Sequence, residues 1–360
     1  MSIFLSKKYK DLVAYVPGEQ PQDRSYIKLN TNESPFPPSA GVISALNRTE
    51  IRKLNFYPDP EARGARIAIA NQFGFRPENI VLGNGSDELL AFCFQAFCDS
   101  SAPAVYADIS YGFYEVYARI NCVESRAIPL DESFNIVAKD FYGADGTIFI
   151  ANPNSPTGGA LPFAEVEAII ERNPRNIVVI DEAYVVFGGE SVIPLVAKYR
   201  NLIVVHTMSK SRNLAGARLG YAVADADLIA DINSMKYSFN PYNVNRLSMQ
   251  AAIAAIKDVD YYKTCVDKII NSRERARSEL FRRGFTILPS SANFLFARPN
   301  FISGADYYEG LKERGILVRH FNKERIKNFV RISIGADDQM RELLLATDAM
   351  IRLYGRAGKN

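Results

Sequence analysis

Short apolar segments alternate with helical segments through the middle of the chain, and this alternation constrains the fold more than any other feature. The apolar runs lie at 80–82, 104–106, 147–150, 177–180 and 202–205. Helical patterns separate several of them, as at 112–120 and 163–172. Short strands that are apolar throughout are typical of parallel sheets covered by helices on both faces. The pattern predicts an α/β fold with a mostly parallel sheet over roughly 60–245.

The regions on either side differ in character. The first ~60 residues are rich in Pro, Asn, Asp and Tyr, which predicts an extended arm with turns. A long helix is expected over about 245–283, ending at Gly284. Beyond it, strand candidates at 286–288, 294–297, 316–318 and 330–334 alternate with helical patterns at 304–314 and 337–354. This alternation predicts a smaller α+β domain.

We therefore divide the chain into three parts. Residues 1–35 form an N-terminal arm that packs with the small domain and the substrate site, 36–245 the large domain, and 246–360 the small C-terminal domain. No segment repeats with a period of 20–50 residues.

Charge and cysteine content argue against several classes of protein. Lys and Arg total 43 and Asp and Glu total 40, so the net charge of +3 gives no reason to expect a nucleic-acid or membrane partner. The four cysteines form no CxxC pair and the chain has two histidines, so neither a metal site nor a disulfide framework is expected. No run of 18 apolar residues and no secretory signal is evident, which favours a cytoplasmic protein with reduced thiols.

Polar or small residues follow four of the expected strands. They are GNGSDE at 83–88, ANPNSPTGG at 151–159, DEAY at 181–184 and HTMSK at 206–210. Because open α/β sheets bind ligands at the carboxyl ends of their strands, four such ends indicate a ligand site.

Each of these segments also has an ordinary structural interpretation. GNGSDE is either a tight turn with Ser86 as a helix N-cap or a phosphate-binding turn, and Glu88 stands where a dinucleotide motif has its third glycine. A nicotinamide dehydrogenase is therefore disfavoured. Asp181 either caps a helix or faces a buried cation. Lys210 is either a solvated loop residue or a desolvated amine able to bind an aldehyde.

The combination favours the functional interpretation. Asp181 and Lys210 are 29 residues apart, and Arg218 follows eight residues later. A carboxylate for a pyridinium nitrogen, a lysine for an aldehyde and a phosphate cup are what pyridoxal phosphate requires of a protein.

The sequence also resembles a known family. SKSRNLAGARLG (209–220), together with NPNSPTG and IDEAY upstream, is similar to the cofactor-binding motifs of fold-type I aminotransferases. KLNTNESPFPPS (28–39), FYPD (56–59) and VRISIG (330–335), with GNGSDE, resemble the histidinol-phosphate aminotransferases. The resemblance covers nearly the whole chain and implies a large α/β/α domain with a smaller α+β domain.

The resemblance implies a role for each matching residue around pyridoxal 5'-phosphate. Lys210 would bind the aldehyde and later move the substrate proton, Asp181 would pair with the ring nitrogen, Tyr184 would donate to the ring hydroxyl oxygen, and Tyr111 would stack on the ring. The phosphate would be bound by the backbone amides of Gly85, Ser86 and Asp87, by Ser209 and Arg218, and by Tyr57 of the neighbouring subunit. The active sites of a homodimer would thus be shared.

Substrate contacts follow from the same resemblance. Arg331 would bind the anionic end of the substrate, Arg319 would assist with a phosphate, and Tyr15 and Asn32 would line the pocket. One position departs from the family, which has asparagine immediately before Pro-Thr-Gly, where this chain has Ser155. Either Ser155 makes the contact to the ring hydroxyl or the loop shifts to admit Asn154, which we include among the candidates.

The expected activity is transamination between L-histidinol phosphate and 2-oxoglutarate, giving imidazole acetol phosphate and L-glutamate. A related aminotransferase for aromatic amino acids or small phosphorylated amines, or a decarboxylase on the same fold, remains an alternative. A pyridoxal-phosphate-binding regulator without catalytic activity is disfavoured, because no residues are left over for a DNA-binding domain.

Overall fold

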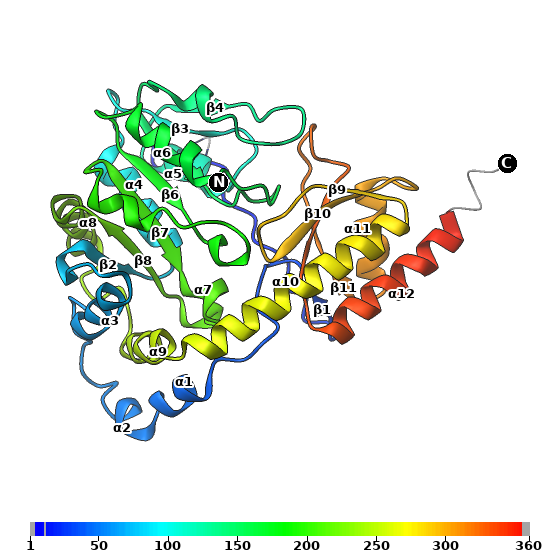
Figure 1. Cartoon of the computed structure of the whole chain (residues 1–360), viewed down its shortest axis with the longest axis horizontal. Helices are drawn as coiled ribbons and strands as arrows, with labels where there is room; N and C mark the ends of the chain where they lie inside the picture. Colours follow the sequence, from blue (N-terminus) through cyan, green and yellow to red (C-terminus); the bar gives the residue numbers. More distant parts are fainter. Residues whose placement is uncertain (1–3, 11, 355–360) are drawn as a thin grey trace.

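The computed structural model describes residues 4–10 and 12–354, and a seven-stranded sheet organises the larger lobe (Figure 1). In spatial order its strands are β2 (Ile80–Gly83), β8 (Gly220–Ala224), β7 (Leu202–Thr207), β6 (Val178–Asp181), β5 (Thr147–Ala151), β3 (Ala104–Ala107) and β4 (Ser125–Ile128). All neighbours pair in parallel except β8, which runs antiparallel to β2 and β7. The predicted α/β fold with a mostly parallel sheet is confirmed.

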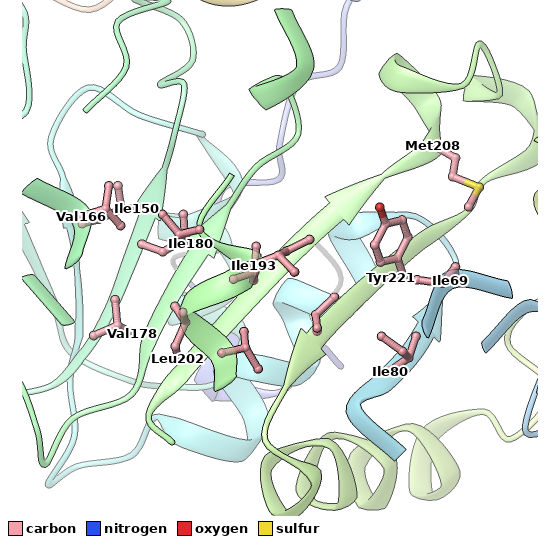
Figure 2. Packing of buried hydrophobic residues seen from close by; sticks show 14 of the residues in the cluster. Ile69, Ile80, Ile150, Val166, Val178, Ile180, Ile193, Leu202, Met208 and Tyr221 are labelled. Carbon is pink, nitrogen blue, oxygen red and sulfur yellow. The ribbon is translucent and has the colours of Figure 1, made fainter. Parts of the chain in front are cut away.

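Alternate side chains of each strand enter different cores, because successive strand residues point to opposite faces. In β6, Val178 and Ile180 belong to one core and Val179 to the other. Figure 2 shows the first of these cores, in which Ile150 and Leu202 of the neighbouring strands lie beside Val178 and Ile180. Burial on both faces explains why these strands are apolar throughout.

Helices cover both faces of the sheet. One core receives side chains from α3 (Arg63–Phe73), α6 (Phe163–Glu171) and α9 (Arg246–Lys257). The other receives them from α4 (Ser86–Phe97), α5 (Phe113–Ile120) and α8 (Ala226–Phe239).

A four-stranded antiparallel sheet forms the smaller lobe. Its order is β12 (Arg319–His320), β13 (Val330–Ser333), β10 (Phe294–Pro299) and β9 (Phe285–Ile287). It packs with α10 (Val259–Arg282), α11 (Gly304–Glu313) and α12 (Asp337–Tyr354) around a third core. The N-terminal segment joins this lobe, since β1 (Ile27–Lys28) pairs in parallel with β11 (Ile316–Leu317).

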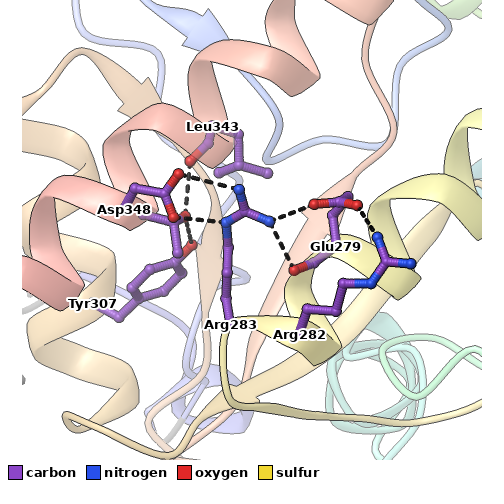
Figure 3. Close-up of polar contacts among 7 residues, drawn as sticks. Glu279, Arg282, Arg283, Tyr307, Leu343 and Asp348 are labelled. Atoms are coloured by element: carbon purple, nitrogen blue, oxygen red, sulfur yellow. Dashed lines mark hydrogen bonds and ion pairs between the residues drawn. The ribbon is translucent and has the colours of Figure 1, made fainter.

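Ion pairs connect α10 to α12 in what we call the Arg283 cluster, comprising Glu279, Arg282, Arg283 and Asp348 (Figure 3). The Arg283 guanidinium donates to both carboxylate oxygens of Asp348, at 2.8 and 3.1 Å, and to Glu279 at 2.6 Å. Its charged groups are thus paired with one another.

Several expected elements differ from those observed. The single helix expected over 245–283 is two helices, because Asp258 leaves the helical conformation with ψ 50°, and its carboxylate binds the Ser39 hydroxyl. The first 60 residues contain two short helices, α1 (Ala40–Ala45) and α2 (Arg48–Ile51), where only an extended arm was expected. The sequence pattern also missed β4, which is largely exposed, and β8, whose Gly and Ala residues have low strand propensity.

The domain limits at 35 and 245 stay a prediction. Residues 1–3, 11 and 355–360, which the arm and the small domain include, lie outside the described residues. None of the helices formed by the described residues has the length and hydrophobicity of a membrane span.

Candidate active site

A cavity of about 350 Å³ lies at the carboxyl edge of the large sheet, where β5, β6 and β7 end and the antiparallel β8 begins. Residues of the N-terminal segment and of β12 and β13 complete its wall. Twelve of the predicted site residues line it: Tyr15, Asn32, Ser86, Asp87, Tyr111, Asp181, Tyr184, Ser209, Lys210, Arg218, Arg319 and Arg331. The fold therefore gathers residues that are more than 300 positions apart in the sequence.

Asp181 is a buried carboxylate at the end of β6. Its Oδ1 accepts from the Ala183 amide at 3.1 Å and its Oδ2 from the Tyr114 hydroxyl at 3.4 Å. Burial raises the pKa of Asp181 to about 7, and the negative charge of Asp87 acts in the same direction. Among the described residues Asp181 forms no ion pair, so this carboxylate suits a cationic ligand atom.

Lys210 lies in the single turn α7 (Met208–Ser211), which starts directly after β7. Its Nζ donates to the backbone oxygen of Thr31 at 2.9 Å. Burial, together with the positive charge of Arg331, lowers the pKa of Lys210 to about 8, while Glu33 opposes the shift. The amine is therefore more available in its neutral, nucleophilic form than an exposed lysine is.

The N-terminus of α4 and Arg218 form a cup in the wall of the cavity. Gly85 has φ 82°, and a Cβ placed there would come within 2.6 Å of Arg218 Nη2. Likewise, a Cβ on Gly220 would come within 2.5 Å of the Ser86 nitrogen. The Arg218 guanidinium binds Asp87 at 3.0 Å, and Asp87 also accepts from the Tyr111 hydroxyl at 2.5 Å. Amides at a helix N-terminus beside a guanidinium suit a phosphate.

Two further arginines, Arg319 and Arg331, line the cavity. Arg331 donates to Ser155 Oγ and to the Asn30 oxygen, each at 3.1 Å, and its buried Nε has no hydrogen-bond partner among the residues that the structure describes. Burial lowers the pKa of Arg331. Arg319 donates to the backbone oxygens of Val16 and Pro17, at 2.6 and 2.9 Å. Both guanidiniums are thus held by neutral groups, which an anionic substrate group can replace or supplement.

Ser155, and not Asn154, lies on the cavity wall. The Asn154 side chain is used elsewhere: its Nδ2 donates to the Ile109 oxygen at 2.9 Å and to Thr157 Oγ1 at 3.0 Å, and its Oδ1 accepts from Ser110 at 2.7 Å. The sequence left open whether Ser155 faces the cavity or the loop shifts to admit Asn154. In the structure the loop has not shifted in this way.

Gly85 and Tyr57 also lie outside the residues that line the cavity. Gly85 is its close neighbour, beside Arg218. Tyr57 is 76% exposed and stacks on Tyr242, with ring centroids 4.4 Å apart. Its predicted role concerns a second subunit and stays a prediction.

Sequence reasoning missed several residues of the site. Asn30 and Thr31 line the cavity and offer backbone oxygens to Arg331 and Lys210, and Tyr114 donates to Asp181. Asn30 and Thr31 lie inside the KLNTNE motif, so the motif marked the segment but gave no role to its carbonyl groups.

Comparisons with known proteins agree with this geometry. The family model for aminotransferase class I and II matches residues 24–346. A histidinol-phosphate aminotransferase of Brachyspira hyodysenteriae is 48% identical over 94% of this chain and 96% of its own length. One of Chromohalobacter salexigens is 45% identical, covering 98% of this chain and 100% of its own. The crystal structure of histidinol-phosphate aminotransferase from Sinorhizobium meliloti, in complex with pyridoxal-5'-phosphate, superposes with a TM-score of 0.87 at 26% identity, covering 98% and 100% of the two chains.

Proposed function

The chain belongs to the class I and II aminotransferases, and we propose that it converts L-histidinol phosphate and 2-oxoglutarate to imidazole acetol phosphate and L-glutamate in histidine biosynthesis. The reaction is reversible and depends on pyridoxal 5'-phosphate. The observation that carries the proposal is a single cavity whose wall holds Asp181, Lys210 and Arg218 together with Arg319 and Arg331. The first three side chains suit the cofactor, and the last two suit a substrate with a strongly anionic group.

The residues present fit pyridoxal phosphate. Asp181 is a buried carboxylate without a counter-ion among the described residues, and the cup of Ser86, Asp87 and Arg218 would be filled by a Cβ at Gly85 or Gly220. Bound pyridoxal phosphate supplies an aldehyde and an electron-accepting ring, so that an amino group can pass between two substrates in separate half-reactions.

The side chains of the cavity then have distinct tasks. Asp181 would pair with the pyridinium nitrogen of the cofactor, and this pairing would keep the carboxylate ionised and the nitrogen protonated. Lys210 would hold the aldehyde of the cofactor, and its amine, once the substrate amine has displaced it, would take the proton from the substrate carbon. Tyr184, whose hydroxyl accepts from Asn32 at 2.9 Å, keeps its own proton free for the ring hydroxyl oxygen.

Arg331 and Arg319 bind the anionic end of either substrate. A phosphate dianion matches two guanidiniums, whereas glutamate and 2-oxoglutarate bring carboxylates to the same place. A second cavity of about 330 Å³ shares Tyr15, Tyr111, Arg319 and Arg331 with the first and continues between apolar side chains such as Val116 and Phe321. This space admits the flat ring of the phosphorylated substrate.

That apolar continuation also favours a second candidate, a related aminotransferase for aromatic amino acids. Half-reaction spectroscopy distinguishes the two. The holoenzyme is mixed with single amino donors and the absorbance of the lysine-bound cofactor is followed. We expect histidinol phosphate and glutamate to abolish it, and phenylalanine and phosphoserine to leave it. A response to phenylalanine alone, or release of carbon dioxide from a donor, would overturn the assignment.

The proposal includes a homodimer with shared active sites. Exposed apolar side chains are concentrated on α1, α2 and the loop that follows: Ile43, Leu46, Ile51, Leu54, Phe56 and Tyr57. A surface of this kind is typical of a subunit interface. On this basis Tyr57 of one subunit reaches the phosphate bound by Arg218 of the other. A fully active monomer in sedimentation and assay would contradict it. A cytoplasmic location belongs to the same proposal and is tested by cell fractionation.

A further inference from the structure

We propose that Ser333 is a positioning residue of the active site, which sets the place of the Lys210 amine through one peptide group of the N-terminal arm and the place of the Tyr184 hydroxyl through Asn32. The inference rests on the proposed function, because that function gives Lys210 and Tyr184 their roles. Ser333 is absent from the cavity wall and lies at the end of β13, two residues after Arg331.

The peptide group between Thr31 and Asn32 connects Ser333 to Lys210. Its N–H, which belongs to Asn32, donates to Ser333 Oγ at 2.8 Å. Its C=O, which belongs to Thr31, accepts from Lys210 Nζ at 2.9 Å. Because a peptide group is planar, an N–H fixed on one side fixes the direction of the C=O on the other. The Ser333 hydroxyl thus determines where the acceptor of the lysine amine points.

The side chain of Asn32 connects Ser333 to Tyr184. The Ser333 hydroxyl donates to Asn32 Oδ1 at 2.8 Å, and Asn32 Nδ2 donates to the Tyr184 oxygen at 2.9 Å. Asn32 has φ 55°, a left-handed conformation that residues other than glycine adopt rarely. A third bond, from Asn293 Nδ2 to the Asn32 oxygen at 2.9 Å, holds the same residue. Asn32 is therefore fixed through its amide, its carbonyl and its side chain.

Strand geometry explains how β13 can hold the segment that contains Asn30 and Asn32. Arg331 and Ser333 point to the same face of the strand, because they are two residues apart. Arg331 Nη2 donates to the Asn30 oxygen at 3.1 Å, so the strand holds Asn30 and Asn32 on either side of the carbonyl that Lys210 binds. Ser333 is 2% exposed and Asn32 1% exposed, so removing the hydroxyl leaves buried polar atoms without partners.

Loss of the Ser333 hydroxyl has a defined consequence for Lys210. A carbonyl that accepts from an amine stabilises its protonated form, so a misdirected Thr31 carbonyl lowers the pKa of Lys210 further. The charged groups that face Lys210 are Arg331, Glu33, Asp87 and Arg218, and none of them is changed by a substitution at 333. A changed titration of Lys210 therefore reports on the carbonyl.

The first test measures the Lys210 amine in the full-length protein freed of pyridoxal phosphate. Trace labelling with acetic anhydride across pH 6–10, followed by peptide mass spectrometry, gives the midpoint at which Lys210 becomes reactive. We expect the midpoint to fall by about 0.5 pH or more in Ser333→Ala and to return in Ser333→Thr, which keeps a hydroxyl. Ser303→Ala is the matched control. Ser303 caps α11 by accepting from the Asp306 amide at 3.1 Å, so its loss weakens the same lobe without touching Asn32.

The second test measures proton transfer in the holoenzyme. In single turnovers with glutamate deuterated at the α-carbon, Ser333→Ala is expected to slow the half-reaction by about tenfold or more, as a misplaced general base would. Its deuterium isotope effect should rise, whereas KM should change less than kcat. Ser303→Ala should leave the isotope effect at the wild-type value.

The outcomes of the two tests support or overturn the positioning role of Ser333. An unchanged midpoint and isotope effect in folded Ser333→Ala would overturn the proposal, as would a Ser303→Ala variant that shows the same shifts. If Ser333→Ala does not fold, Ser333→Cys takes its place, because a thiol has similar size but is a weak donor and acceptor. If the wild type fails to convert histidinol phosphate while the Lys210 midpoint still depends on Ser333, the proposed substrate is wrong and the positioning role stands.

Discussion

The Arg283 cluster and the cavity both gather charged side chains, but they satisfy the charges differently. In the Arg283 cluster, carboxylates and guanidiniums bind one another (Figure 3). In the cavity, Arg218 pairs with Asp87, but Lys210 donates to a backbone oxygen, and among the described residues Arg331 Nε has no partner and Asp181 forms no ion pair. The paired charges of the Arg283 cluster serve the fold, whereas charged groups that are held by neutral partners remain able to bind a ligand.

The charged groups of the cavity also lower the stability of the fold. Burial raises the pKa of Asp181 to about 7 and lowers that of Lys210 to about 8, so in each case the charged form is disfavoured in the fold. Such a cavity is less stable than one built for packing alone, and a bound ligand of complementary charge offsets the cost. The predictions below test this contrast, beginning with the largest effect.

Replacing Lys210 by Met should lower the half-reaction rate by at least about 10³-fold, since both the covalent attachment and the proton acceptor are lost. The same change should stabilise the cofactor-free protein at pH 7, because it removes a buried ammonium. The folded pKa of Lys210 lies below its usual 10.5, so the wild type gains stability as pH rises from about 8 to 10.5. Thermal unfolding across this range should show a smaller gain in Lys210→Met than in the wild type, because Lys236, whose pKa burial also lowers to about 8, contributes to the gain in both proteins. If the melting temperatures of the two proteins rose equally with pH, burial of the Lys210 ammonium would not destabilise the fold.

Replacing Asp181 by Ala should lower transamination by about 10²–10⁴-fold, the effect of losing roughly 3–5 kcal/mol of a buried ion pair in the transition state. Asp181→Asn isolates the pH dependence. The folded protein keeps the proton of this carboxyl to about pH 7, whereas the unfolded chain releases it near 3.8, so wild-type cofactor-free protein loses stability as pH rises between these values. The Asn variant should lack that contribution. Near-normal turnover in Asp181→Ala would refute its role.

Substitutions of the two arginines proposed to bind the substrate, Arg319 and Arg331, should differ in their effect on the two substrates. Charge-assisted hydrogen bonds contribute roughly 1.5–3 kcal/mol, so each loss should reduce kcat/KM by about 10- to 150-fold. Arg319→Ala should weaken histidinol phosphate more than glutamate, whereas Arg331→Ala should impair both. The half-reactions are measured separately, because the mechanism is ping-pong. Equal losses for both substrates in Arg319→Ala would exclude Arg319 as a phosphate ligand.

The smallest effect on activity is expected in the Arg283 cluster. Arg283→Met should lower the free energy of unfolding by about 1 kcal/mol, because the network is partly exposed and screened by solvent. The half-reaction rate should stay within about twofold of the wild type, since this guanidinium binds α10 and α12 side chains and does not line the cavity. Denaturant unfolding and the standard half-reaction suffice as measurements. A large loss of turnover without a loss of stability would contradict the proposed difference between the Arg283 cluster and the cavity.

The sequence predicted the parts that depend on pattern and motif. Apolar runs located the central strands, and the residues that follow them brought Asp181 and Lys210 to one edge. Features that depend on the backbone path were not predictable. The break at Asp258, the reversed direction of β8 and the choice of Ser155 over Asn154 arise from tertiary contacts. The carbonyl of Thr31 was missed because backbone groups carry no sequence signal.

The most direct test of the central claim compares two lysines whose pKa is lowered by desolvation. Lys236 is 3% exposed and burial lowers its pKa to about 8, like that of Lys210, but its Nζ donates to the Pro60 oxygen at 2.7 Å, away from the cavity. The protein is loaded with pyridoxal phosphate, reduced with borohydride and mapped by peptide mass spectrometry. We predict label on Lys210 and none on Lys236. Label on Lys236 or on any other lysine in place of Lys210 would contradict the account.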